Sequence, residues 1–406
     1  MRYTRIEKAV GCSRTGSPLS VFYVLTFFLF AIACSKSGTP GQRAAADVNC
    51  DTITGENADD CIRLNQIQVL GTHNSYKLAP NPTLVNLLDK ERPGWSENIV
   101  YEHRELREQL EDLGIRQFEL DIFADPVGGK YAEPVGATMS GDEQFLNHKE
   151  MLTPGFKVFH SQDTDYRTTC LTFKSCLHEI REWSLANPTH LPILVLVEVK
   201  DGPRQDWSTV AFTTPVAVDQ DNIHEIDSEI WDVFSRDHVL TPDDVRGEFP
   251  SLEEAVLTDG WPTLTQSRGH LLFALDNTGE HRDYYLAGSP DLKERAMFVS
   301  SNPGEPTAAF IKMNDAIKRF DQIKQFVSDG YVIRTRADLP LYEARTGDTK
   351  RREAALTSGA QYVSTDYPEP SPFGSGYVVS LPGTRHIGRC NPVSALATCR
   401  NEFLKE

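Results

Sequence analysis

Two acidic residues, Glu119 and Asp121, stand two positions apart in the apolar stretch "FELDIF". Side chains at this spacing on a β-strand point to the same side, so both carboxylates would share one partly buried place. Carboxylates held together repel each other unless a proton or a metal ion lies between them. Asn74 in "GTHNSY" and Glu198 in "LVEVK" would add two further oxygen ligands. An all-oxygen set selects Ca²⁺, or less readily Mg²⁺, over zinc or copper.

Two histidines follow apolar stretches of the same kind: His73 ends "IQVLGTH" and His160 ends "FKVFH". Because oxygen ligands suffice for a hard cation, both imidazoles are free for proton transfer. A simple turn is the alternative for the first histidine, since Gly, Asn and Ser are ordinary turn residues and a histidine beside them can be solvated. Together with the acidic residues, the pair indicates acid–base chemistry assisted by a divalent cation.

Basic residues near the same stretches leave a second interpretation open. Lys200, two positions after Glu198 and on the same face, could contact a phosphate or pair with the neighbouring carboxylates. Arg334 and Arg336 in "YVIRTRAD" could likewise neutralise the acidic residues in a salt network, because ion pairs also gather at strand ends. These residue types alone do not choose between a metal site and a salt network.

Eight short apolar runs predict the strands that would position these residues: "IQVLGTHN", "IRQFELDIF", "FKVFHSQD", "ILVLVEVKD", "HLLFALDN", "AMFVSSN", "YVIRTRAD" and "AQYVSTDYP". Amphipathic stretches such as "EHRELREQLEDLGI" and "AAFIKMNDAIKRFDQIKQFVSDG" lie between them and predict helices. Apolar strands that alternate with helices are typical of a parallel sheet covered on its outside. Eight such units over about 320 residues predict an α/β fold, a (β/α)8 TIM-type barrel with decorated loops. The long segment 201–269 predicts an inserted loop or extra helices.

Nearly every predicted strand ends in polar residues that are capable of chemistry. The last run ends in Asp366 and Tyr367, and the fifth ends in Asp276 and Asn277. The carboxyl ends of barrel strands converge on one face, where the active sites of such folds lie. A turn could explain the polar residues at the end of any one strand, but it does not explain why nearly every strand ends in such residues. We therefore expect a shared site at the barrel mouth.

The first residues have the pattern of an export signal. A basic lead precedes the apolar run "VFYVLTFFLFAIA", which is too short to span a bilayer comfortably. The ending "AIAC" resembles a bacterial lipoprotein cleavage site, so residues 1–33 are expected to be a lipoprotein-type signal peptide and Cys34 the lipidated first residue. Cleavage at an ordinary signal site stays open, because Ala31 stands where Leu is commoner. We expect a cell-envelope lipoprotein or a secreted protein.

The rest of the chain is expected to divide into three parts. Residues 34–60 are predicted to form a flexible tether, residues 61–370 the barrel, and residues 371–406 a C-terminal extension with a disulfide. Of the eight cysteines, Cys12 and Cys34 belong to the leader, which leaves six. An even number in an exported chain predicts disulfides. Among several possible connectivities we expect neighbours to pair: Cys50 with Cys61, Cys170 with Cys176, and Cys390 with Cys399.

The charge of the chain limits its partners. The formal net charge is −17, and no long basic run is present. This disfavours nucleic acid and a general electrostatic attraction to anionic membranes. Contact with a membrane is expected through a lipid on Cys34, and no obligate protein partner is evident.

Five short motifs resemble those of a known family. "GTHNSY", "ELD", "VFHS", "LVEVK" and "STDYP", in this order, resemble the calcium-dependent phosphoinositide-specific phospholipase C family of bacteria, within the phospholipase C-like phosphodiesterase superfamily. The resemblance runs from about Asn65 to Pro368. It implies His73 and His160 as the catalytic pair. It implies one Ca²⁺ with the following ligands: Asn74, Glu119, Asp121 and Glu198.

The resemblance also implies a substrate and a reaction. Arg334 and Tyr367 lie where related enzymes hold inositol and its phosphates, while Asp366 is a candidate for inositol hydroxyls and Lys200 for a phosphate. The substrate would be a phosphatidylinositol-type lipid, cleaved to diacylglycerol and a cyclic inositol phosphate by attack of the inositol 2-hydroxyl. His73 is expected to donate to a phosphoryl oxygen and His160 to protonate the leaving oxygen, while a carboxylate or a histidine takes the hydroxyl proton.

Two other functions stay open. A glycerophosphodiester phosphodiesterase on the same barrel also uses E-x-D carboxylates and two histidines, although it usually has Arg where this chain has Asn74. A surface lipoprotein that binds inositol lipids or glycans without turnover is the other alternative.

Overall fold

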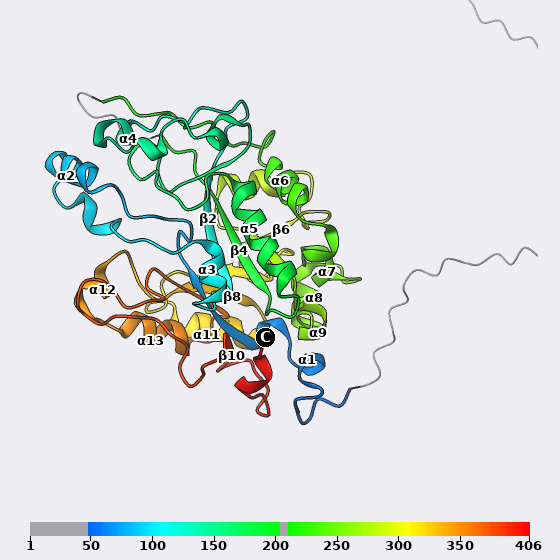
Figure 1. The fold of residues 1–406 in the computed structure, drawn as a ribbon. Coiled ribbons are helices and arrows are strands. Elements are labelled where there is room, and N and C mark those ends of the chain that lie inside the picture. Colours follow the sequence, from blue (N-terminus) through cyan, green and yellow to red (C-terminus); the bar gives the residue numbers. More distant parts are fainter. Residues whose placement is uncertain (1–47, 204–209) are drawn as a thin grey trace, which may run out of the picture. The chain divides into compact units, whose positions relative to one another are not determined.

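The Val-, Ile- and Leu-rich runs form parallel strands in a computed structural model that describes residues 48–203 and 210–406 (Figure 1). The strands of the barrel are β1 (Ile67–Thr72), β2 (Gln117–Phe123), β4 (Ile193–Val199), β5 (Leu271–Leu275), β6 (Met297–Val299), β7 (Phe310–Lys312), β8 (Val332–Arg336) and β9 (Tyr362–Thr365). Neighbours follow the order β6-β5-β4-β2-β1-β9-β8-β7, and a parallel bridge from Ser300 to Phe310 nearly closes the ring between β6 and β7. The predicted (β/α)8 TIM-type barrel is confirmed.

Helices cover the outside of the strands, as the amphipathic stretches predict (Figure 1). Along the described residues the helices are α1 (Ala58–Cys61), α2 (Pro82–Glu91), α3 (Leu106–Glu111), α4 (Val135–Ser140), α5 (Phe173–Ala186), α6 (Glu225–Val233), α7 (Pro242–Arg246), α8 (Leu252–Thr258), α9 (Leu264–Ser267), α10 (Glu280–Leu286), α11 (Phe320–Asp329), α12 (Tyr342–Thr346) and α13 (Lys350–Thr357). Of these, α2 and α4 contact each other and lie away from the strands (Figure 1). Helix α5 begins after Thr172, whose hydroxyl accepts from the Ser175 N–H and so caps the first turn. Helices α6 to α9 are the extra helices expected within segment 201–269.

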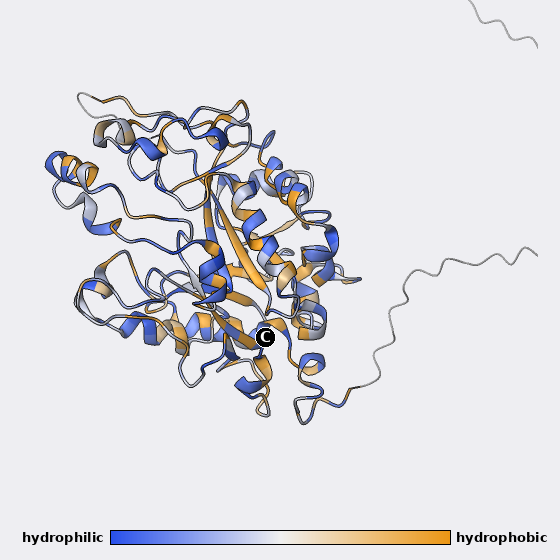
Figure 2. Cartoon of the chain, in the orientation of Figure 1, coloured by the Kyte–Doolittle hydropathy of each residue, from blue (hydrophilic) through white to orange (hydrophobic). Residues whose placement is uncertain are grey.

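The barrel strands are buried on both faces. All seven residues of β2 and all five of β5 are buried, and Figure 2 shows the neighbouring strand β4 as strongly hydrophobic. Burial on both faces explains why the runs are continuously apolar rather than alternating. The charged residues of these strands, among them Glu119, Asp121 and Arg334, are consequently buried as well.

Two elements differ from the sequence prediction. The run "FKVFHSQD" contains only the short strand β3 (Lys157–Val158), which pairs antiparallel with the end of β2 and lies outside the barrel ring. The eighth barrel strand is instead β7, inside a stretch that was predicted to be helical, where the helix α11 begins only at Phe320. A strand of three residues is too short to show a period of its own, so the helical pattern of its neighbours concealed it.

Three disulfides join the cysteines that are neighbours in sequence, which confirms the expected pairing: Cys50–Cys61, Cys170–Cys176 and Cys390–Cys399. Disulfides persist in oxidising compartments, so they indicate a protein that is exported from the cytosol. The predicted signal peptide and the lipidation site Cys34 lie outside the described residues. Within the described part of the chain, no helix is both long and apolar enough to cross a membrane.

Both ends of the described chain pack against the barrel. Of the residues expected to form a tether, those from 48 to 60 are described, and among them Ile53 is buried. In the C-terminal extension, β10 (Gly388–Cys390) pairs antiparallel with β1. Near the chain end, the carboxylate of Glu406 forms an ion pair with Arg116, whose side chain is buried. These contacts join residues 371–406 to the end of the barrel opposite to the predicted site.

Candidate active site

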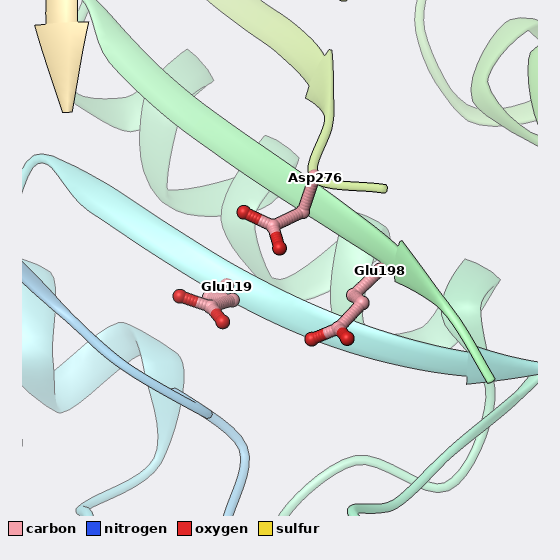
Figure 3. Close-up of side chains that lie close together, drawn as sticks. All are labelled: Glu119, Glu198 and Asp276. Atoms are coloured by element: carbon pink, nitrogen blue, oxygen red, sulfur yellow. The ribbon is translucent and has the colours of Figure 1, made fainter. Parts of the chain in front are cut away.

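Three acidic side chains from adjacent strands meet at the carboxyl end of the barrel. Glu119 lies in β2, Glu198 in β4, and Asp276 directly follows β5. Each offers one carboxylate oxygen, and these oxygens all lie within 4.8 Å of one another. Figure 3 shows the three carboxylates close together, Glu119 on β2, Glu198 on β4 and Asp276 just after β5. In the parallel register of β2 and β4, Glu119 pairs with Leu196, two residues before Glu198, so the two acidic residues are diagonal neighbours on one face of the paired strands.

Asp121 lies beside this acidic cluster. It is the strand partner of Glu198 in the register of β2 and β4, and its side chain is fully buried. Neither Asp121 oxygen has a hydrogen-bond partner, although Oδ2 lies 3.4 Å from Nζ of Lys200, and Oδ1 of Asp276 has no hydrogen-bond partner either. A buried carboxylate oxygen without a partner is costly unless a cation or a proton satisfies it. The orphaned oxygens therefore fit a bound hard cation.

Basic side chains surround the acidic residues. The Arg334 guanidinium pairs with Glu119, and the Lys312 ammonium pairs with Asp276. Lys200 lies 2.7 Å from Glu198 and 3.4 Å from Asp121. The salt network that the sequence left open is therefore present. Three basic side chains face four carboxyl groups, so Glu198 and Asp121 share Lys200.

The protonation of two carboxylates reflects this excess of acidic groups. Burial raises the pKa of Glu119 to about 7, with Asp276 and Glu198 adding to the rise and Arg334 opposing it. Burial also raises the pKa of Asp121 well above its usual range, and Lys200 only partly offsets this. A divalent cation reverses such a shift, because it stabilises the ionised carboxylates that bind it.

Asn74 is the amide expected among the metal ligands. It directly follows His73 beyond β1 and adopts a left-handed backbone with φ 48°, which an Asn tolerates better than most residues. Its amide nitrogen donates to the Tyr101 hydroxyl at 2.8 Å. That hydrogen bond leaves the side-chain carbonyl as the Asn74 atom available to a cation. The Ser75 hydroxyl accepts from the Glu119 N–H at 2.8 Å and so joins this loop to the β2 strand of the acidic cluster.

His73 lies between a carboxylate and a guanidinium. Its Nδ1 is 2.8 Å from Oδ1 of Asp366, and its Nε2 is 3.1 Å from Nη1 of Arg336. Because a guanidinium only donates, Nε2 accepts and the ring proton lies on Nδ1, where it is donated to Asp366. Burial lowers the pKa of His73 to about 3, and Arg336 adds to this effect while Asp366 opposes it. The imidazole is therefore neutral, and its Nε2 lies 3.8 Å from Glu119.

His160 has an acidic partner of its own. It lies in the loop after β3, and its Nδ1 is 2.7 Å from Oδ2 of the buried Asp165. The side chain of His160 is 31% exposed, which is more than that of His73 at 15%. An imidazole held through Nδ1 presents Nε2 to its surroundings, so Nε2 is the His160 atom available to a ligand.

The sequence comparisons place these residues in a known family. The family model described as "Phosphoinositide phospholipase C, Ca2+-dependent" matches residues 62–392. The chain belongs to this family. As a calcium-dependent phosphoinositide phospholipase C family member, the protein is a phosphoric diester hydrolase. The family implies calcium, and the acidic cluster with its orphaned oxygens fits that ion. A search of curated proteins found no match.

Solved structures with a similar fold come from bacteria. A calcium-dependent phosphoinositol-specific phospholipase C from Pseudomonas sp is 15% identical, with a TM-score of 0.50, over 84% of this chain and 98% of that chain. A Ca²⁺-dependent phosphatidylinositol-specific phospholipase C from Streptomyces antibioticus is 18% identical, with a TM-score of 0.47, over 78% and 98%. A phosphatidylinositol-specific phospholipase C from Listeria monocytogenes is 15% identical, with a TM-score of 0.43, over 81% and 97%. At these identities, the first likeness supports the barrel fold alone.

The residues expected to bind substrate in this family member differ in their surroundings. Lys200 is partly exposed at the mouth and can reach a ligand. Arg334 is buried and already donates to Glu119, Asn314 and Ser364. Asp366 is buried with both oxygens engaged by His73 and Arg336. Tyr367 is buried, and its hydroxyl has no hydrogen-bond partner. Of these residues, Lys200 is thus the one with an open path to substrate.

Three further site residues escaped the sequence analysis. Arg336 was weighed only as part of a salt network, yet it contacts both His73 and Asp366. Asp276 was noted as a polar residue at the end of the fifth run, yet it joins the acidic cluster. Lys312 was assigned to a helix and could not be recognised as a residue of the barrel mouth. A short apolar run that ends in a lysine, "FIK", was the available signal.

Proposed function

We propose that the protein is a calcium-dependent, phosphatidylinositol-specific phospholipase C that releases diacylglycerol and a cyclic inositol phosphate. The observation that carries this proposal is the position of His73, which is held by Asp366 with Nε2 3.8 Å from Glu119 of the acidic cluster. A neutral base beside a site for a hard cation suits deprotonation of a hydroxyl that attacks phosphorus.

One Ca²⁺ would be held by side chains of the acidic cluster and its neighbours: Asn74, Glu119, Asp121 and Glu198, with Asp276 as a further candidate. When bound, the ion supplies positive charge that polarises a phosphodiester oxygen and makes a nearby hydroxyl more acidic. Ca²⁺ is favoured over Mg²⁺ because it accepts a larger and less regular set of oxygen ligands.

His73 acts as the general base in this proposal. A donor role to a phosphoryl oxygen was expected for His73, but its neutral imidazole presents Nε2 as an acceptor, here of the Arg336 N–H, so we assign it the role of proton acceptor instead. The proton comes from the inositol 2-hydroxyl as its oxygen attacks phosphorus. Arg336, which already points at Nε2, is the donor available to a phosphoryl oxygen. Both groups are fixed by Asp366, so little reorganisation is needed.

His160 acts as the general acid. Asp165 holds its Nδ1, so the Nε2 proton can pass to the oxygen of diacylglycerol as the phosphorus–oxygen bond to that oxygen breaks. Because the attacking hydroxyl belongs to the same molecule, positioning of the inositol supplies much of the rate. Lys200, beside Glu198 at the mouth, would contact a phosphate oxygen.

The proposal includes attachment to a membrane. A lipid on Cys34 would keep the enzyme at the cell envelope, where its lipid substrate is presented on a surface. The protein would then be a bacterial envelope lipoprotein, and cleavage of the leader at an ordinary site would instead give a secreted enzyme. Mass spectrometry of the mature N-terminus distinguishes these two products.

The test uses vesicles that contain phosphatidylinositol. The wild type should release diacylglycerol with added calcium and lose this activity in a calcium chelator. Glu119→Gln should bind calcium poorly and remain inactive at calcium concentrations that saturate the wild type. Glu179→Gln is the matched control and should behave as the wild type, because Glu179 is a partly buried acidic residue on α5 that accepts from the Arg107 N–H. Equal activity with and without calcium would contradict the proposal.

A further inference from the structure

A buried lysine lies behind the general acid. The loop after β1 and the loop after His160 run antiparallel: the Thr169 N–H donates to the Tyr76 carbonyl at 2.8 Å, and Lys77 forms a bridge with Thr168. This backbone pairing fixes Lys77 beneath the His160 loop. The backbone at Lys77 is held by hydrogen bonds between two chain segments, so the starting point of its side chain is fixed.

The ammonium of Lys77 is enclosed by groups of the site. Its side chain is fully buried, and Nζ lies 2.7 Å from Oδ1 of Asp165 and 3.3 Å from the carbonyl of Leu78. Nζ also lies 5.0 Å from the centre of the Tyr101 ring, whose hydroxyl contacts both Asn74 and His73. A fully buried lysine is rare and costly unless it is paired.

Building on the function proposed above, we propose that Lys77 is a positioning residue for His160, which it holds through Asp165 in the orientation that protonates the leaving group. Asp165 uses its two oxygens separately, Oδ1 for Lys77 and Oδ2 for His160. Lys77 thereby fixes both the charge and the direction of the carboxylate. The Nδ1 proton of His160 is directed at Oδ2, and the Nε2 proton is presented to the leaving oxygen.

The charges around Asp165 favour this arrangement. The groups that face it are Lys77, His160, and the hydroxyls of Tyr76 and Tyr101, whose pKa values burial raises so that both hydroxyls stay neutral. Burial alone would raise the pKa of Asp165, but Lys77 and then His160 outweigh it and the pKa is lowered. Without the Lys77 charge, the carboxyl would tend to take up a proton and lose its hold on His160.

The test compares two substrates that differ in their leaving group. Diacylglycerol leaves as an alkoxide and needs a proton, whereas p-nitrophenolate leaves without one. Lys77→Met should lower the turnover of phosphatidylinositol on the order of 10²-fold and that of the p-nitrophenyl ester of inositol 1-phosphate by less than about threefold. His160→Ala is the reference and should show the same selective loss. If Lys77→Met does not fold, Lys77→Gln keeps a donor for Asp165 and removes only the charge.

Lys157→Met is the matched control, because Lys157 is also fully buried and lies 3.6 Å from an aspartate, Asp125, that holds no histidine. Lys157→Met should lower the turnover of phosphatidylinositol and that of the p-nitrophenyl ester by the same factor, because it affects only the stability of the fold. If His160→Ala lowers both turnovers alike, the role proposed for His160 is wrong and that of Lys77 falls with it. If His160→Ala is selective and the Lys77 variants are not, the inference about Lys77 is wrong and the proposed function stands.

Discussion

Nδ1 of His73 lies 2.8 Å from Oδ1 of Asp366, and Arg336 completes a triangle by reaching Nε2 of the same imidazole and Oδ2 of the same carboxylate, each at 3.1 Å. The pKa of Asp366 is lowered to about 2, because His73 and then Arg336 outweigh the effect of burial. The triangle therefore contains an ionised carboxylate, a neutral imidazole and a cation. This arrangement fixes the ring tautomer of His73 and leaves Nε2 able to accept a proton.

Replacement of Asp366 should reduce catalysis with little effect on substrate binding. Asp366→Asn keeps the size of the side chain but lets the imidazole adopt the other tautomer, as in other histidine sites that lose their carboxylate. We expect kcat to fall by about 10²- to 10⁴-fold with KM nearly unchanged. Asp227→Asn serves as the control. It removes a buried carboxylate on α6 that accepts from the Tyr285 hydroxyl. A similar kcat for the two variants would contradict the role of Asp366.

Calcium binding should depend on pH. In the absence of the ion, the pKa of Glu119 is raised to about 7 and that of Asp121 is raised as well, so both carboxyls hold protons at mildly acidic pH. Calcium needs the ionised forms and must displace these protons. The affinity for calcium should therefore rise as the pH is raised from 5.5 to 8. Each proton that calcium displaces raises the affinity by up to about tenfold per pH unit. Calorimetry in buffers of different ionisation enthalpy measures the protons released, and a release of none would contradict this prediction.

The buried His190 should make stability fall in acid. Burial lowers its pKa to about 4, while the unfolded chain has its ordinary value of 6.5. The unfolded state thus binds the proton first as the pH falls below 6.5, and the stabilisation present above that value is lost down to about pH 4. The slope is about 1.4 kcal/mol per pH unit.

The variant His190→Gln isolates this contribution. The difference in unfolding free energy between the wild type and His190→Gln should shrink as the pH is lowered from 7 to 4. Contacts of His190 with Ser184 and Leu191 add an offset that does not change with pH. Urea unfolding at several pH values measures the difference, and a constant difference would show that His190 is protonated alike in both states.

The disulfide between Cys170 and Cys176 should stabilise the segment that follows His160. It closes a loop with a sequence separation of 6 and anchors that segment to the start of α5. The double variant Cys170→Ala and Cys176→Ala should lose about 2 kcal/mol of unfolding free energy. Denaturant unfolding measures this loss, and an unchanged free energy of unfolding would mean that the loop is held by its other contacts.

The sequence was sufficient to predict the barrel and to bring a set of candidate site residues to one of its ends. Apolar runs buried on both faces are visible in a sequence, and polar residues at their ends converge wherever parallel strands form a barrel. Glu119, Glu198 and His73 could be found in this way. The spacing of Glu119 and Asp121 also predicted two carboxylates on one side of β2, and the structure buries both.

Other parts of the site depend on contacts between distant segments. Arg334 and Arg336 are the same residue type and lie two positions apart on β8. No sequence pattern therefore tells which arginine contacts Glu119 and which contacts His73. His160 was expected at the end of a barrel strand, but the strand before it pairs antiparallel with β2 outside the ring. The partners of Lys77 and Lys312 lie 88 and 36 residues away, and only the fold brings them together.

The central claim is that an inositol hydroxyl attacks the phosphodiester at a calcium site beside His73. Phosphorus NMR of the first water-soluble product from phosphatidylinositol tests it most directly. The account predicts a cyclic inositol phosphate that forms with calcium, is absent in a chelator, and is absent or much slower with His73→Ala. Glycerol 3-phosphate as the product of glycerophosphoinositol, with no cyclic species from the lipid, would contradict the account and indicate a glycerophosphodiesterase.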